Sequence, residues 1–222
     1  MPRRPSFPYR YSYPRPMLTV DVAPLRVQRG RLELLLIRRD KEPFPGHWAL
    51  PGGFVEENEP LATAARRELW EETRLEPLLL QQVGAFGDPG RDPRGWSVTV
   101  AYLALVGPGA NRAVAGDDAA AVAWHPVARL PPLAFDHEQI VAQAVETLRH
   151  RALTTAMLAV LLPPRFTWEQ LGRLVAAVTG QRHDLATLRR RFQSLGLTQQ
   201  RRGRAGGALV TFRLLDRGDQ VY

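Results

Sequence analysis

The sequence predicts an α+β or layered α/β/α domain followed by a small winged helix-turn-helix domain. Strand-like segments, interrupted by one amphipathic helix and closed by another, occupy residues 17–150. Three helical segments and a strand pair joined by a glycine-rich turn occupy residues 153–222, a succession typical of a winged helix-turn-helix. Because the charge of the chain also changes near residue 150, we expect two domains rather than one.

The composition is that of a folded protein and excludes some chemistry. Hydrophobic residues make up 45% of the 222 residues and charged residues 23%, as in ordinary globular chains. The absence of cysteine excludes disulfides, zinc-thiolate sites and a cysteine nucleophile. No apolar run approaches the roughly 20 residues that span a bilayer, and none follows Arg3-Arg4 as an export signal requires. We therefore expect a cytoplasmic protein that does not bind membranes.

The positive charge is confined to the end of the chain. Residues 1–150 contain 18 Lys or Arg and 18 Asp or Glu, whereas residues 151–222 contain 12 and 4, which accounts for the whole net charge of +8. Such a local positive field favours a polyanionic partner, and nucleic acid is the partner that we expect. The alternative is arginine-biased codon usage, since Lys41 is the only lysine, but that bias does not explain why acidic residues become rare after residue 150.

The first segments predict an arm and a hairpin. Residues 1–16 are rich in Pro, Arg and Tyr, which predicts an extended N-terminal arm. Loose alternation of apolar and polar residues over 17–27 and a compact apolar run over 32–37 predict two strands that turn at Arg29-Gly30. A loop marked by prolines and a glycine follows at 41–47.

A helix and further strands complete the first domain. An apolar stripe at three- and four-residue spacing predicts a helix over 60–73, and Pro60 suits its first turn. The stripe consists of Leu61, Ala64, Ala65 and Leu69. Residues 140–149 are expected to close the domain as a helix. The strand-like segments between the two helices are 78–83, 98–106 and 120–124.

The second domain begins with three predicted helices. Residues 154–162 and 167–178 are expected to be helical, the latter opening with a Thr-x-x-Gln capping pattern at Thr167. Asp184 is expected to cap a third helix that runs to Ser194, with Gly196 beyond its end. Two strands are then predicted, joined by the turn RRGRAGG, at 197–200 and 208–214.

Glu68, Glu71 and Glu72 form the most informative cluster. At about 100° per residue they fall within an arc of roughly 100° on one helix face. Like charges at this spacing oppose helix formation by about a few tenths of a kcal/mol per pair, so we expect a cation to offset them. Mg²⁺ and Mn²⁺ take oxygen ligands and bridge carboxylates to phosphates. The alternative is a solvated acidic face on which Arg67 pairs with Glu71.

The segment before this helix favours the ligand site over the solvated face. Gly52 and Gly53 have no side chains, so the backbone can approach a ligand closely, and Glu59 adds a carboxylate. Together these residues resemble the Nudix hydrolase box, G-x5-E-x7-R-E-U-x-E-E-x-G-U, where U is apolar. Arg74 replaces the second glycine, and a left-handed backbone there costs on the order of 1 kcal/mol. The matching residues are Gly53, Glu59, Arg67, Glu68, Leu69, Glu71, Glu72 and Leu75.

The resemblance implies a Nudix sandwich and a hydrolase that depends on Mg²⁺ or Mn²⁺. It makes Glu68 and Glu72 the main metal ligands and Glu71 a further ligand or water-orienting group. Arg67 would hold the carboxylates, and the carbonyl near Gly52 would also coordinate metal. Metal-activated water would attack the pyrophosphate of a nucleoside diphosphate linked to another group. The general base stays open among Glu72, Asp117, Asp118 and Glu138.

The segments after the box indicate a substrate. Pro89 follows Arg74 by fifteen residues, which resembles the spacing that marks ADP-ribose pyrophosphatases. Phe135-Asp136-His137 resembles a segment of Nudix modules attached to NAD metabolism, although His137 is expected to cap or pack. Gly53 is a further candidate for the substrate. The candidates for its phosphates are Arg38, Arg39, Arg91 and Arg94, for which the alternative is a solvated role. The candidates for adenine are Phe86 and Trp96, for which the alternative is a core role.

Residues 153–222 resemble the winged-helix domain of Nudix-related transcriptional regulators of NAD metabolism. The resemblance rests on Arg165-Phe166-Thr167, the helix over 183–194 and the arginine-rich hairpin. It implies double-stranded DNA as a partner. Three consecutive arginines spread around more than half of a helix, so at most two face one groove and at least one contacts phosphate. The predicted DNA-binding residues are Arg189, Arg190, Arg191, Arg201, Arg202 and Arg204.

Two functions stay open. The complete set of box glutamates favours a hydrolase of ADP-ribose, or of a related nucleoside diphosphate derivative, joined to a DNA-binding domain. The concentrated C-terminal charge favours a repressor of NAD metabolism that senses ADP-ribose without hydrolysing it. Because two-fold DNA readers place two winged helices about one helical turn apart, we also expect a homodimer.

Overall fold

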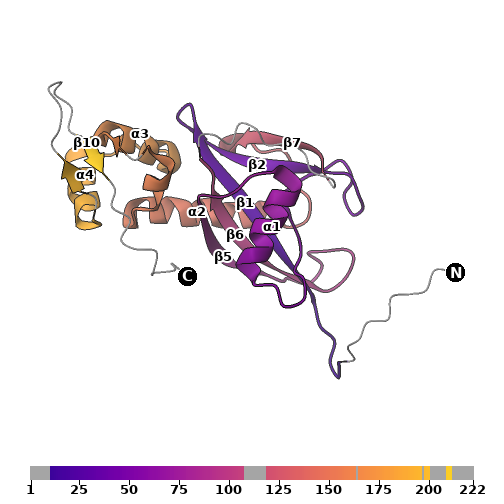
Figure 1. The fold of residues 1–222 in the computed structure, drawn as a ribbon. Helices are drawn as coiled ribbons and strands as arrows, with labels where there is room; N and C mark the ends of the chain where they lie inside the picture. Colours follow the sequence, from indigo (N-terminus) through magenta and orange to yellow (C-terminus); the bar gives the residue numbers. More distant parts are fainter. Residues whose placement is uncertain (1–10, 108–118, 164, 197, 201–208, 212–222) are drawn as a thin grey trace.

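A seven-stranded mixed sheet forms the centre of the first part of the chain, with α1 and α2 on its two faces (Figure 1). The structure, a computed structural model, describes residues 11–107, 119–163, 165–196, 198–200 and 209–211. The strands are β1 (Met17–Gln28), β2 (Arg31–Arg39), β3 (Trp48–Ala49), β4 (Gly52–Phe54), β5 (Leu79–Phe86), β6 (Ser97–Leu105) and β7 (Ala119–Pro126). Their main order is β3-β2-β1-β6-β5, with β4 paired to β1 and β7 to β2. Only β1 and β6 pair in parallel among these.

Alternate side chains of the central strands enter two separate cores. On β1, Val20 and Val22 pack with α1 (Leu61–Thr73), whereas Ala23 and Leu25 pack with α2 (His137–Thr154). This alternation follows from the two-residue repeat of a strand. A sheet with two apolar faces needs a helix on each, so the predicted sandwich is confirmed.

The β1–β2 hairpin turns where the sequence predicts. Arg29 and Gly30 both have positive φ, 50° and 73°, as expected for a two-residue turn that matches the twist of its strands. The turn sets Leu25 opposite Leu34 in the antiparallel pair. The turn thereby aligns two long apolar strands, β1 and β2, side by side in the sheet.

Helix α1 confirms the prediction over residues 60–73. Its buried residues include Ala64, Ala65 and Leu69, and Pro60 precedes its first turn. The helix ends at Arg74, which has the left-handed conformation with φ 58° and ψ 25° and donates its amide to the carbonyl of Trp70. Arginine therefore occupies the backbone conformation for which glycine is preferred.

The segment after α2 differs from the predicted helix over 154–162. Helix α2 continues to Thr154, and Thr155 is extended. The 3₁₀-helix η3 (Met157–Leu161) follows, so the predicted α-helix is wrong. Because Leu162 precedes a proline and is itself extended, with φ −98° and ψ 154°, an α-helix could not continue through it.

Two capped helices and a small sheet follow. Helix α3 (Trp168–Thr179) opens with the predicted capping box of Thr167 and Gln170, and α4 (Leu185–Ser194) is capped by the Asp184 carboxylate. The predicted strands appear as β9 (Thr198–Gln200) and β10 (Leu209–Thr211), while the short β8 (Arg165–Phe166) was not predicted. The order is β8-β10-β9. The turn RRGRAGG lies largely outside the described residues.

One apolar core joins the sheet to these helices. The cluster on the α2 side of the sheet extends through η3 to Phe166, Leu171 and Phe192, which are fully buried. The C-terminal elements therefore pack against the rest of the chain. Among the described residues, no helix is long and apolar enough to cross a membrane.

The left-handed residue at the end of α1 yields the first prediction. Replacing Arg74 by Gly should raise the free energy of unfolding by about 1 kcal/mol relative to Arg74→Ala, because alanine keeps the steric strain that glycine relieves. Urea unfolding of the two variants measures the difference. The comparison removes the Arg74 side chain in both cases, so equal stability would contradict the strain.

Candidate active site

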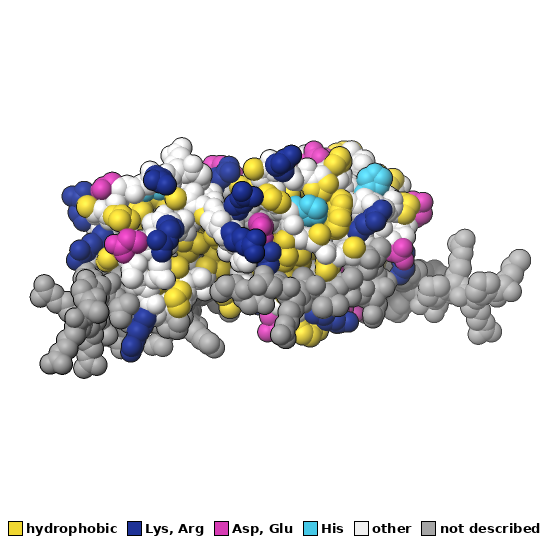
Figure 2. Space-filling view, turned by 90° about the horizontal axis from the view of Figure 1, so that it is seen from above, with side chains coloured by type: hydrophobic (Ala, Val, Ile, Leu, Met, Phe, Trp, Pro, Cys, Tyr) yellow, Lys and Arg dark blue, Asp and Glu magenta, His cyan; other side chains and the backbone are white. Residues whose placement is uncertain are grey.

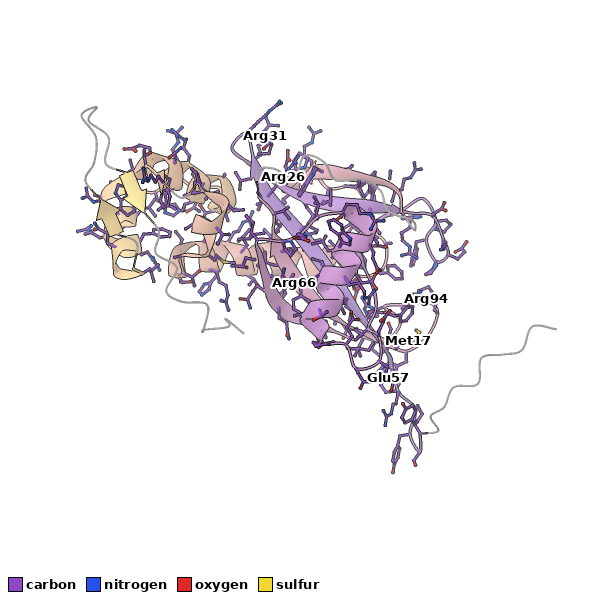
Figure 3. The ribbon with its side chains drawn as sticks, viewed as in Figure 1. Met17, Arg26, Arg31, Glu57, Arg66 and Arg94 are labelled. Carbon is purple, nitrogen blue, oxygen red and sulfur yellow. The ribbon has the colours of Figure 1, made fainter. Side chains whose placement is uncertain are left out.

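The predicted site residues surround a cavity of about 450 Å³ at one end of the sheet. Its walls are the end of β4, the inner face of α1, the loop after β2 and the loop between β5 and β6. Arg94, on the last of these loops, lies at the end of the sheet that is farther from α3 and α4 (Figure 3). The structure thus brings together residues that are up to about a hundred positions apart in the chain.

Arg67 neutralises most of the acidic face of α1. Its Nε and Nη2 donate to the two carboxylate oxygens of Glu59, each at 2.9 Å, while Nη1 donates to Glu68 at 2.7 Å and to Glu71 at 3.1 Å. Nη2 also donates to the carbonyl of Phe54. The hydrogen bond with Glu59 is the largest cause of the raised pKa of Arg67. The predicted Arg67–Glu71 pair is present, but it belongs to a network that faces the cavity.

The two glycines of β4 allow the backbone to approach this cluster. A Cβ on Gly53 would lie 2.6 Å from the Glu68 carboxylate, and one on Gly52 would lie 2.2 Å from the carbonyl oxygen of Val20. A side chain at Gly52 would clash with the backbone of β1, and one at Gly53 would have to displace the Glu68 carboxylate that Arg67 holds. The amide of Gly52 donates to Glu72 at 2.9 Å, so β4 and α1 are joined directly at the cavity.

Glu72 is the glutamate of the α1 cluster whose negative charge is not paired with Arg67. Burial raises its pKa to about 8, and the nearby charges of Glu68 and Asp21 raise it further, against the hydrogen bond from Gly52. Burial also raises the pKa of Glu68, against its pairing with Arg67. Among the described residues no three acidic or histidine side chains already converge as a metal-binding group. The site nevertheless has oxygen donors whose charge is poorly compensated, which is the donor chemistry that suits a hard cation.

Arg39 and Arg94 face the cavity beside an aromatic ring. The Arg39 guanidinium lies 4.9 Å from the ring centre of Phe135 and donates to the carbonyl of Pro43. Arg94 lies 5.8 Å from the same ring and pairs with Asp92 at 2.7 Å. Its side chain is 40% exposed. Neither Nη1 atom takes part in these bonds, so each guanidinium group keeps a donor for an anion in the cavity that both residues line.

Arg91 also lines the cavity, but its guanidinium is enclosed by acids. Nε and Nη2 donate to the two oxygens of Asp136, both at 2.8 Å, and Nη2 is 3.4 Å from Asp21. The Arg91 side chain is only 5% exposed. The structure thus gives Arg91 a structural position: it ties the β5–β6 loop to the start of α2 and to β1.

His137 completes this cluster. Its Nδ1 accepts the amide hydrogen of Leu50 at 2.9 Å, which places the ring proton on Nε2, 3.4 Å from Asp21. Burial raises the pKa of Asp21, but its contacts with His137 and Arg91 outweigh burial and lower it overall. Sequence reasoning missed Asp21. The signal was present, because a lone aspartate stands within the apolar strand MLTVDVAPL.

Other predicted residues lie away from the cavity. Pro89 is exposed on a turn, Trp96 is 57% exposed and Phe86 packs at the edge of the α2-side core. Glu138 is exposed in the first turn of α2, and Arg38 donates to the carbonyl of Gly46. None of these five lines the cavity. Asp117, Asp118, Arg201, Arg202 and Arg204 lie outside the described residues.

Together, the sandwich, the arginine-bound glutamates of α1 and the glycine strand beside them define a Nudix protein. The NUDIX domain model matches residues 15–144, and the chain belongs to the Nudix family. The chain is similar to the "ADPR responsive transcriptional repressor NtrR" of Acinetobacter baylyi, with 37% identity over 85% of this chain and 76% of that protein. It is also similar to an "ADP-ribose pyrophosphatase" of Methanocaldococcus jannaschii, with 43% identity over 49% of this chain and 63% of that protein.

A solved relative covers both parts of the chain. The structure of Shewanella oneidensis NrtR has a TM-score of 0.77 at 33% identity and covers 89% of this chain and 94% of its own. The same protein has been solved with a 27mer DNA, with a TM-score of 0.75 at 34% identity over 87% of this chain and 92% of its own. Its NUDIX domain has been solved with ADP ribose, with a TM-score of 0.55 at 37% identity over 62% of this chain and 91% of its own.

The enclosure of Arg91 yields a prediction for stability. Arg91→Gln should lower the free energy of unfolding by about 3–5 kcal/mol, because it leaves Asp21 and Asp136 buried without their cation. Arg38→Gln is the control, since it removes an exposed arginine from β2 and should change the free energy of unfolding by about 0.5 kcal/mol or less. Urea unfolding measures both. Equal effects of the two substitutions would show that the Arg91 cluster is not structural.

Proposed function

We propose that this chain hydrolyses the pyrophosphate of ADP-ribose, or of a related nucleoside diphosphate derivative, and that its C-terminal part binds double-stranded DNA. The observation on which the first half rests is the position of Glu68, Glu71 and Glu72, which line one cavity together with Arg39 and Arg94. Acidic residues opposite arginines suit a substrate whose phosphates need both a metal ion and direct hydrogen-bond donors.

The donor set fits a divalent metal such as Mg²⁺ or Mn²⁺. Glu68 and Glu72 are the proposed principal ligands, with Glu71 and the backbone carbonyl at Gly52 as further oxygen donors. The raised pKa of Glu72 has the physical cause that a cation would remove, namely an uncompensated buried charge. The metal, when bound, would neutralise phosphate charge and lower the pKa of an attacking water.

Other residues of the chain would orient the carboxylates and bind the phosphates. Arg67 fixes Glu59, Glu68 and Glu71, so the carboxylates stay oriented without further reorganisation. Arg39 and Arg94 supply N–H donors to the phosphates, and Gly53, which lines the cavity, lets its own backbone approach the substrate. Pro89 and Arg91 shape the β5–β6 loop that presents Arg94. In the reaction, water adds to one phosphorus and the bridging oxygen leaves with the other, which gives AMP and ribose 5-phosphate.

Among the described candidates, Glu72 is the proposed general base. It lines the cavity, whereas the exposed Glu138 does not. Arg67 does not bind Glu72, and the Gly52 amide hydrogen-bonds to its Oε2, so Oε1 can accept a proton. Its place on α1 also puts it beside Glu68, a proposed metal ligand that lies one turn away on the same face.

A repressor that senses ADP-ribose without hydrolysing it is the second candidate. The name of the Acinetobacter relative and its coverage of both parts of this chain support it. The pyrophosphatase relative and the intact glutamates support hydrolysis, and we place the bifunctional protein first. Incubation of the purified chain with ADP-ribose and Mg²⁺, followed by an assay for AMP, separates the two.

Glu72→Gln tests the hydrolase directly. The substitution removes one charge with little change in volume and keeps an oxygen that can accept from the Gly52 amide. It should lower turnover by orders of magnitude without loss of stability. Glu76→Gln, an exposed acid outside the cavity, should retain the full rate. AMP release measures both, and an unchanged rate in Glu72→Gln would sink the hydrolase assignment.

We propose that the chain comprises an arm over 1–16, a Nudix domain over 17–150 and a winged helix-turn-helix domain over 153–222. The two capped helices α3 and α4 and the sheet β8-β10-β9 support the last of these. A Cβ on Gly172 would lie 2.7 Å from a Leu185 methyl, so glycine allows α4 to start directly against α3.

Lys and Arg outnumber Asp and Glu over this end of the molecule, at the left of Figure 2. The homodimer stays a prediction.

Helix α2 supports a coupling between the two parts. Its first turn carries His137 at the cavity wall, after Asp136, which holds Arg91. Its other end packs against α3, and Arg149 is 3.4 Å from the carbonyl of Val178. The complexes of the Shewanella relative with ADP ribose and with DNA support the two ligands.

We therefore predict that ADP-ribose changes DNA affinity. A coupling free energy of about 1–3 kcal/mol corresponds to a shift of roughly 5–150-fold. The full chain first selects a DNA duplex from a random pool, and that duplex is labelled with a fluorophore. The Glu72→Gln variant is then titrated with it, because this variant should not hydrolyse the ADP-ribose during the measurement. By reciprocity, the same duplex should change the affinity for ADP-ribose by the same factor. Equal DNA affinity with and without saturating ADP-ribose, at fixed salt, would contradict the coupling and show that the two parts bind their ligands independently.

A further inference from the structure

The rotation of helix α4 about its axis is fixed by its buried side. Leu188 is 3% exposed and Phe192 is fully buried, and both belong to the core that α3 completes. Leu185, at the start of the helix, lies against Gly172 of α3. These contacts anchor one face of α4 along its whole length. The direction in which each of its arginines projects follows from helical geometry.

The three consecutive arginines consequently have different positions. At about 100° per residue, the middle of the buried face lies between Leu188 and Phe192. Arg190 then points about 180° away from it, directly outward. Arg189 and Arg191 project about 80° to either side of the buried face. All three are exposed, but only Arg190 lies on the outermost ridge of the helix.

The Arg190 side chain is also directed by a neighbour. Its Nη2 lies 3.4 Å from the hydroxyl of Thr187, one turn nearer the start of the helix. Thr187 in turn donates its amide to the Asp184 cap at 2.8 Å. The guanidinium is thus drawn toward the N-terminal half of α4, which is the part of a recognition helix that enters the major groove. No acidic residue occurs within α4 itself.

We propose that Arg190 reads a guanine in the major groove of double-stranded DNA, while Arg189 and Arg191 hold phosphates on the two walls of that groove. This rests on the proposed DNA-binding function. The ridge of a helix that lies in a groove about 12 Å wide faces the base edges, and its flanks face the two backbones. Arginine recognises guanine through two hydrogen bonds, to O6 and N7. Arg190 therefore supplies sequence specificity and its neighbours supply affinity.

A selection experiment tests this division. Full-length chain, with no ligand added, selects duplexes from a library with a randomised central segment, and the consensus is compared with that of Arg190→Ala. The unaltered chain should require a guanine at one position of each half-site. Arg190→Ala should bind the consensus about tenfold to a hundredfold more weakly and accept any base pair at that position. Arg190 lies opposite the core, so the variant should fold normally.

Arg189→Ala and Arg191→Ala are the matched controls. Each should select the same motif and weaken binding to consensus and altered duplexes alike. The slope of log affinity against log salt should fall in magnitude by about 0.9 for each. Retention of the guanine preference by Arg190→Ala, or its loss in either control, would overturn the assignment of Arg190. If the unaltered chain enriches no motif, the DNA-binding function itself falls, and the assignment falls with it.

Discussion

The architecture of the site depends on the guanidinium of Arg67. Acidic side chains three and four residues apart on one helix repel each other, and Arg67 converts that repulsion into a fixed arrangement by binding Glu59, Glu68 and Glu71 at once. Its bond to the carbonyl of Phe54 also ties α1 to the end of β4. Glu72 is left out of this network, so one face of α1 holds both compensated and uncompensated carboxylates. That difference favours a ligand site over a solvated acidic face.

Local patterns predicted the parts of the molecule that neighbouring residues determine. The α1 stripe, the turn at Arg29-Gly30 and the capping box at Thr167 each depend on residues within a few positions of one another, and all are present. The box has a glycine at the position of Arg74, which is compatible with a left-handed backbone there, and the structure shows that conformation. The helix over 154–162 failed because its apolar spacing does not reveal that Thr155 is extended.

Long-range pairing accounts for what the sequence did not reveal. Arg91 resembled a phosphate donor, yet it binds Asp136, 45 residues away, and Asp21, 70 residues away. No periodicity links such positions, since only the sheet register brings β1 beside β6 and its loop. Asp21 is visible in the sequence as a lone aspartate in an apolar strand, but its pairing with Arg91 and His137 does not follow from that pattern. Sequence context alone therefore does not separate Arg91, which binds two carboxylates and has a structural role, from the other cavity arginines, Arg39 and Arg94.

Helix α2 gives the chain a mechanical continuity that a flexible linker would not. Its 18 residues span about 27 Å, from His137 at the cavity to α3, which in turn contacts α4 and its arginines. A flexible linker would absorb a small displacement at its first turn. We expect a helix packed along one continuous core to transmit such a displacement to α3 and α4, since close-packed interiors have few voids in which to dissipate it. The orientation of Arg190 depends on that same core through Leu188 and Phe192, so the cavity and the arginine proposed to contact a base belong to one packed body.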